Sequence, residues 1–161
     1  MHVVFISLGS NLGDRQNAIL SAHKLLAKDI SLICASRIFE TPPWGYEDQP
    51  PFLNQVIKAT TQLPPLKLID KLKGIEMEVG REPNFRYGPR LIDLDILFYD
   101  DMIFKTEELT IPHPEITNRA FVLLPLMDIA PNYVHPEFQT KISDLIRLVD
   151  TNEIIAYVGE K

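Results

Sequence analysis

The stretch Ile-Asp-Leu-Asp-Ile-Leu-Phe-Tyr at residues 92–99 is the clearest strand signal in the sequence. Side chains two residues apart in a strand share one face and lie ~7 Å apart. Asp93 and Asp95 therefore point the same way. We expect the opposite face to be apolar and to be formed by Ile92, Leu94, Ile96 and Phe98. The pattern predicts a core strand that presents two carboxylates on its other side.

Strand and helix periodicities alternate on either side of this stretch. Asp14 is suited to cap one helix, and Pro65 and Gly80 are suited to the two ends of another. The order β-α-β-β-α-β predicts an α+β fold, a ferredoxin-like antiparallel sheet with helices packed on both sides in three layers. We expect strands at 2–8, 31–40, 52–61, 92–99, 102–105 (after a hairpin turn at 100–101), 109–111 and 153–158, and helices at 15–28, 65–79, 118–129 and 142–149.

The composition limits the classes of protein to consider. A length of 161 residues suits one domain, 1–161, with a core of its own. Cys34 is the only cysteine, and no apolar run approaches a membrane span, so we expect a soluble cytoplasmic protein. Sixteen Lys and Arg against 22 Asp and Glu give a net charge of -6. That balance argues against nucleic acid as a partner.

Basic side chains cluster just before the two aspartates. Arg81, Arg86 and Arg90 lie in a loop that leads into the strand, and Lys73 lies in the helix before it. Paired carboxylates suit Mg²⁺, and arginines beside them suit the phosphates of a metal-bound polyphosphate. The alternative for the basic cluster is surface ion pairing with neighbouring glutamates. The combination favours a metal and phosphate site.

Aromatic residues gather around a proline-rich loop at 41–51. Trp44, Phe52 and Phe121 offer faces for stacking, and Asn54 offers an amide with donor and acceptor edges. Taken singly, each aromatic residue would be an ordinary core residue, but the group suits a flat heterocycle. His113 and Arg119 lie in another proline-held loop and could hydrogen-bond phosphate oxygens or a leaving group.

Five motifs in order resemble the 6-hydroxymethyl-7,8-dihydropterin pyrophosphokinase family of the folate pathway. They are Gly9-Ser10-Asn11-Leu12-Gly13, Thr41-Pro42-Pro43-Trp44-Gly45, Asp48-Gln49-Pro50 with Phe52-Leu53-Asn54, Arg86-Tyr87-Gly88-Pro89-Arg90-Leu91-Ile92-Asp93-Leu94-Asp95, and Pro112-His113 with Asn118-Arg119-Ala120-Phe121. The resemblance implies a ferredoxin-like fold and transfer of pyrophosphate from ATP to the pterin hydroxymethyl group, with release of AMP.

The resemblance also implies residue roles. Asp93 and Asp95 would hold two Mg²⁺ ions and, with Arg81, Arg86 and Arg90, would be catalytic. ATP would contact Lys73, Glu76, Arg81, Arg86, Tyr87, Arg90, Ile96, Leu109, Thr110, His113 and Arg119. The pterin would contact Thr41, Pro42, Pro43, Trp44, Phe52, Asn54, Asp93 and Phe121.

Two other functions use the same features. The first is another Mg²⁺-dependent nucleotidyl, phosphoryl or glycosyl transferase built on the two aspartates, which would differ in its products. The second is a non-enzymatic ferredoxin-like module that binds a ligand without metal or turnover. For the pyrophosphokinase we expect small-molecule partners, no nucleic acid, no membrane, and a monomer or weak homodimer.

Overall fold

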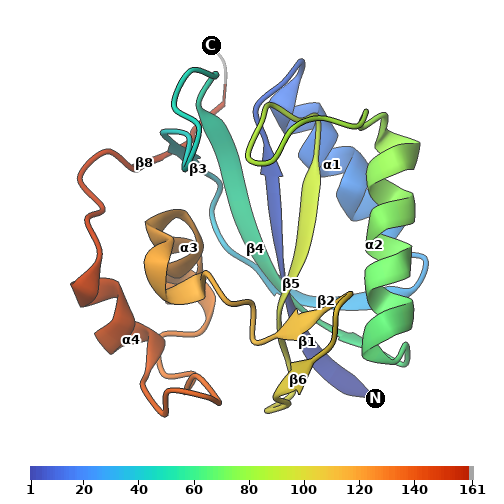
Figure 1. Ribbon diagram of the computed structural model, residues 1–161, viewed down its shortest axis with the longest axis vertical. Helices are drawn as coiled ribbons and strands as arrows, with labels where there is room; N and C mark the ends of the chain where they lie inside the picture. The colour runs from blue at the N-terminus through green and yellow to red at the C-terminus, as the bar shows by residue number, and fades with distance from the viewer. Residues whose placement is uncertain (160–161) are drawn as a thin grey trace.

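The computed structural model describes residues 1–159. Its elements alternate in the predicted way along the chain (Figure 1). The strands are β1 (His2–Ser10), β2 (Ile30–Ala35), β3 (Phe39–Thr41), β4 (Phe52–Thr61), β5 (Asp93–Tyr99), β6 (Phe104–Lys105), β7 (Thr110–Ile111) and β8 (Ile155–Ala156). The helices are α1 (Arg15–Leu26), α2 (Pro65–Val79), η1 (Ile116–Asn118), α3 (Ala120–Ile129), α4 (Ile142–Leu145) and η2 (Ile146–Leu148).

One antiparallel sheet forms the middle of three layers. Its order is β5-β1-β4-β3-β8, and β2 also pairs with β4. Helices α1 and α2 cover one face, and α3 and α4 lie on the other (Figure 1). The first core joins α1 and α2 to residues such as Ile6, Leu53 and Leu94, and the second joins α3 to Phe5 and Val56. The predicted α+β sheet with helices on both sides is confirmed.

Local signals in the sequence explain the two long helices. The Asp14 side chain accepts a hydrogen bond from the Asn17 amide at 3.0 Å, as expected of an N-cap. Helix α2 has a proline in its first turn and ends at Val79, and the capping residue Gly80 has a φ of 114°, which suits glycine. No helix within residues 1–159 is long and apolar enough to cross a membrane.

The faces predicted for residues 92–99 are correct at the start of this stretch and wrong at its end. Ile92, Leu94 and Ile96 pack against the α1 and α2 layer, but Phe98 lies in the core under α3. The reason is a shift in register: Ile6 pairs with Ile96 and Phe5 with Phe98, so Leu97 is an extra residue in β5. A bulge of this kind reverses the alternation beyond it.

Other element predictions need correction. The stretch 31–40 forms two strands that both pair with β4, because the chain turns away between them. The turn at 100–101 does not lead to a hairpin with β5, since β6 pairs with β7. The helix predicted from Asn118 starts at Ala120 after a separate 3-10 turn, the helix at 142–149 breaks into α4 and η2, and the strand at 153–158 keeps two residues.

Candidate active site

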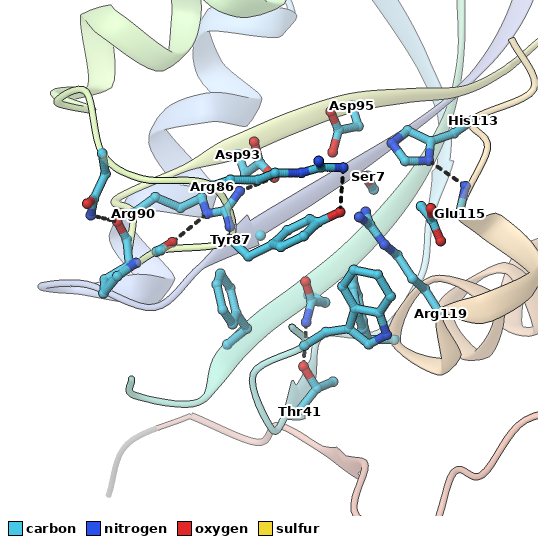
Figure 2. Close-up of a pocket in the computed structure, with 18 of the residues that line it drawn as sticks. Ser7, Thr41, Arg86, Tyr87, Arg90, Asp93, Asp95, His113, Glu115 and Arg119 are labelled. Carbon is cyan, nitrogen blue, oxygen red and sulfur yellow. Dashed lines mark hydrogen bonds and ion pairs between the residues drawn. The ribbon is translucent and has the colours of Figure 1, made fainter. Parts of the chain in front are cut away.

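The site lies on the part of the sheet that α3 leaves uncovered. Each central strand carries apolar side chains under α3 and different residues further along the same face. In β1 these are Ser7 and Gly9, which pair with Asp95 and Asp93 of β5. In β4 they are Phe52 and Asn54. Together they form the floor of a cavity of about 420 Å³. The loops around residues 41–51, 81–92 and 112–119 form its walls (Figure 2).

Two arginines bind the first aspartate. Arg81 Nη1 donates to Asp93 Oδ1 at 2.8 Å, and Arg90 Nη1 donates to Asp93 Oδ2 at 3.0 Å. Behind them lies Glu76, a buried residue of α2 that accepts from the Leu94 amide at 2.8 Å. Glu76 also pairs with Arg81 at 2.9 Å and with Lys73 at 3.1 Å. A chain of alternating charges therefore runs from α2 to the cavity.

The two aspartates differ in their proton affinity. Burial raises the pKa of Asp93, but the charges of Arg90 and Arg81 outweigh it and hold the pKa below its ordinary value. Burial and then the neighbouring Asp93 charge raise the pKa of Asp95 to about 7. Burial likewise raises the pKa of Glu76 in spite of the Lys73 charge. Within residues 1–159, Asp93 has ion pairs with two arginines, whereas Asp95 has none.

His113 and Arg119 approach the aspartates from the side opposite Arg86 and Arg90 (Figure 2). His113 Nδ1 accepts a hydrogen bond from the Glu115 amide at 3.1 Å, so the proton of the neutral ring lies on Nε2. Burial and the Arg119 charge lower the pKa of His113 to about 4, so the ring is a neutral donor. Arg119 Nε is buried and has no hydrogen-bond partner within residues 1–159. An anion in the cavity would supply one.

Arginine side chains also cover the aromatic part of the cavity. The Arg119 guanidinium lies 4.7 Å from the Trp44 ring centroid and 5.6 Å from that of Phe121, and Arg90 lies 5.6 Å from that of Phe52. Asn54 is buried and donates to Thr41 Oγ1 at 2.6 Å. A Cβ on Gly9 would lie 2.9 Å from Asn54 Oδ1, so this close approach requires glycine.

The arginine-bearing loop packs against the proline-rich loop. Tyr87 packs edge-on against Trp44 with centroids 5.1 Å apart, and Phe85 packs in the same way against Tyr46 at 5.0 Å. Gln49 Nε2 donates to the Tyr87 carbonyl at 2.6 Å. The contacts hold Tyr87 at the cavity wall, where its hydroxyl accepts from Arg86 Nη2 at 2.9 Å.

Most of the residues named from the sequence meet in this one cavity. They are Thr41, Pro42, Trp44, Phe52, Asn54, Arg81, Arg86, Tyr87, Arg90, Asp93, Asp95, His113, Arg119 and Phe121.

Six of the residues named from the sequence do not line the cavity. Pro43 lines a second hollow, beside the C-terminal segment. Lys73 and Glu76 lie behind Arg81. The side chains of Ile96 and Leu109 pack in the core with α1 and α2, and Thr110 is in β7.

The cavity has further lining residues to which the sequence patterns assign no role. They are Ser7, Gly9, Asn84, Phe85, Gly88, Pro89, Pro114 and Glu115. Ser7 and Gly9 could have been found from the pairing of β1 with the aspartate strand, because they alternate with Phe5 on one face.

The carboxylates suit a hard divalent cation. No group of three or more His, Cys, Asp or Glu side chains within residues 1–159 could enclose a metal ion. Two aspartates two residues apart instead supply a partial set of oxygen ligands. Mg²⁺ is bound in this way, with waters and substrate phosphates completing its shell. The donor set therefore fits Mg²⁺ held jointly with a polyphosphate.

The sequence of residues 5–131 matches the family described as 7,8-dihydro-6-hydroxymethylpterin-pyrophosphokinase (HPPK). The chain belongs to the HPPK family. An HPPK relative from Aquifex aeolicus (strain VF5), a 2-amino-4-hydroxy-6-hydroxymethyldihydropteridine pyrophosphokinase, is 42% identical over 144 residues, which are 89% of this chain and 90% of the relative. The protein of the same name from Haemophilus influenzae (strain ATCC 51907 / DSM 11121 / KW20 / Rd) is 40% identical over 157 residues, 96% of this chain and 98% of the relative. The resemblance seen in the sequence motifs is confirmed.

Solved structures support the HPPK fold. The crystal structure of wild-type Plasmodium falciparum HPPK-DHPS with pteroate superposes with a TM-score of 0.74 at 18% identity. The superposition covers 91% of this chain and 44% of that one, so this chain spans less than half of the longer protein. At this identity the likeness concerns the fold alone.

Proposed function

We propose that this chain transfers the pyrophosphoryl group of ATP to the hydroxymethyl group of 6-hydroxymethyl-7,8-dihydropterin, giving AMP and the pterin diphosphate of folate biosynthesis. The observation that carries the proposal is the continuity of the cavity. A carboxylate pair with arginines at one end and a group of aromatic rings with a buried amide at the other line the same 420 Å³ space. The reaction needs both halves within reach of one another.

The polar half would hold the nucleotide. Asp93 and Asp95 would hold two Mg²⁺ ions, which when bound neutralise the triphosphate charge and polarise the phosphorus under attack. Arg81, Arg86 and Arg90 would pair with phosphate oxygens. His113 would donate from Nε2 as a neutral ring, and Lys73 and Glu76 would position Arg81 from behind.

The aromatic half would hold the pterin. Phe52 and Phe121 offer faces for stacking, and Trp44 with Pro42 closes the end of the pocket. Asn54 is fixed by its hydrogen bond to Thr41, and within residues 1–159 its carbonyl oxygen is free to accept from a ring nitrogen or amino group. A rigid pocket of this kind would hold the hydroxymethyl group toward the aspartates.

The chemical step follows from that arrangement. The hydroxymethyl oxygen forms a bond to the β-phosphorus, and the bond from the β-phosphorus to the oxygen that bridges to the α-phosphate breaks. AMP leaves with that oxygen, and the hydroxymethyl proton passes to solvent. Arg119, whose buried Nε has no acceptor within residues 1–159, would donate to the departing phosphate.

The test is to identify the products with ATP, MgCl₂ and the reduced hydroxymethylpterin. We expect AMP and pterin diphosphate in equal amounts, and almost none in Asp93→Ala or Asp95→Ala. Near-normal turnover by both variants at saturating Mg²⁺ would contradict the assigned roles. That the enzyme is cytoplasmic and is a monomer or weak homodimer stays a prediction, which fractionation and sedimentation would check.

A further inference from the structure

Both oxygens of the Asp93 carboxylate carry an arginine hydrogen bond. Arg81 binds Oδ1 at 2.8 Å and Arg90 binds Oδ2 at 3.0 Å. All three side chains are largely buried, with 28%, 16% and 23% of Arg81, Arg90 and Asp93 exposed. We call Arg81 and Arg90 together the Asp93 clamp. The clamp occupies the carboxylate that we assign to a metal.

Each arginine of the clamp is held by other groups. Arg81 Nη1 also pairs with Glu76 Oε2 at 2.9 Å, and only 4% of the Glu76 side chain is exposed. Arg90 Nε donates to the Gly88 carbonyl at 3.0 Å, and the Arg90 amide donates to Asn11 Oδ1 at 2.9 Å. The clamp is therefore a built part of the site.

The Asp93 carboxylate is already neutralised without a metal. In the ion-paired network, Lys73, Arg81 and Arg90 carry three positive charges against the two carboxylates of Glu76 and Asp93. A divalent cation that bound alone would meet two guanidinium groups already paired with its ligand. ATP, with about four negative charges, would bring two Mg²⁺ ions in with no net charge, and its phosphates would offer the arginines new partners.

We propose that the Asp93 clamp stands in for the metal in the ligand-free enzyme and keeps divalent cations out until a polyphosphate draws the arginines away. The inference rests on the proposed function, in that Asp93 and Asp95 form the metal site. It assigns Arg81 and Arg90 a second role, on the carboxylate, besides their role on the phosphates. Metal and nucleotide then bind with positive coupling, and each raises the affinity for the other by the same factor.

The direct test is to titrate the nucleotide-free protein with Mn²⁺, a hard cation that prefers the same ligands, and to count the free ion by electron paramagnetic resonance. Arg90→Gln removes one cation from the clamp. We expect it to bind Mn²⁺ about ten-fold or more tightly than the wild type, because a unit charge near the ligand is removed. If that variant does not fold, Arg81→Gln carries the same expectation.

Arg86→Gln is the matched control. It removes the same charge from the same loop, but Arg86 binds the Tyr87 hydroxyl and not Asp93. We expect its Mn²⁺ affinity to rise much less than that of Arg90→Gln, because Arg86 has no hydrogen bond to Asp93 to give up. The double variant Arg90→Gln/Asp95→Asn should lose the gain, because one of the two carboxylates is then missing.

Four results would contradict the proposed clamp. They are equal Mn²⁺ affinity in wild type and Arg90→Gln, an equal gain in Arg86→Gln, a gain that persists in the double variant, and tight Mn²⁺ binding by the free wild type. The product assay on the wild type judges the proposed function separately. AMP formation together with tight Mn²⁺ binding by the free wild type would leave the function standing and remove the clamp.

Discussion

Asp95→Asn should abolish turnover and yet stabilise the ligand-free protein. Burial and the Asp93 charge raise the pKa of the Asp95 carboxyl from 3.8 to about 7. A group whose pKa is raised on folding gives its full stability below the pKa of the unfolded chain and loses it as pH rises through the folded pKa. The ionisation of Asp95 therefore lowers the stability of the wild type progressively between pH 3.8 and about pH 7, and the loss is complete above that range.

The size of the effect follows from the same shift. A rise of this extent corresponds to at most about 4 kcal/mol at alkaline pH. Water reaches the half-buried carboxylate and screens its charge, so we expect a gain of about 2 kcal/mol in the free energy of unfolding. More than half of the gain should develop as pH rises from about 5 to about 8.

Urea denaturation at both pH values measures this gain. Asp70→Asn is the control, because it makes the same chemical change at an exposed position of α2 and should alter stability little at either pH. A free energy of unfolding for Asp95→Asn no higher than that of the wild type at the higher pH would contradict a raised pKa of Asp95. A gain as large at the lower pH would contradict it as well.

Two further variants test the contact between the proline-rich loop and the arginine-bearing loop, and the role of His113. Gly45→Ala should lower turnover about ten-fold with little effect on the global fold, because its Cβ would lie 2.9 Å from Tyr87 and its φ is 87°. The control is Gly74→Ala, whose Cβ would have no heavy atom within 4 Å and which should leave turnover unchanged. His113→Gln should flatten the fall in the free energy of unfolding between about pH 6.5 and pH 4, because His113, with its pKa lowered to about 4, gives stability above the unfolded pKa and loses it as pH falls. Unaltered turnover in Gly45→Ala would contradict the first prediction. The same fall in the free energy of unfolding with pH in His113→Gln and wild type would contradict the second.

The sequence predicts the site better than the details of the sheet. Alternation in residues 92–96 is unambiguous, since charged and apolar side chains take turns, and the structure places both aspartates on one face. In Leu97 and Phe98 the alternation carries no information, because all neighbouring side chains are apolar. A bulge there leaves no trace in the pattern. The predicted face of Phe98 was therefore wrong.

Tertiary contacts decide what local patterns cannot. The sequence predicts that the arginine loop approaches the aspartates, but the contacts of Glu76 with the Leu94 amide and of Arg81 with Asp93 depend on how α2 docks beside β5. Ser7 and Gly9 carry no chemical signal of their own, and only the strand register brings them into the cavity. The hairpin expected at 100–101 fails for a similar reason, since β6 finds its partner in β7.

The most direct test of the central claim is which phosphorus is attacked. ATP labelled at both the β- and γ-phosphorus would be incubated with the chain, MgCl₂ and the reduced hydroxymethylpterin, and the label followed into the products. Attack at the β-phosphorus delivers both labels to the pterin and leaves unlabelled AMP. Recovery of labelled ADP with a pterin monophosphate would show attack at the γ-phosphorus and would contradict the proposed function.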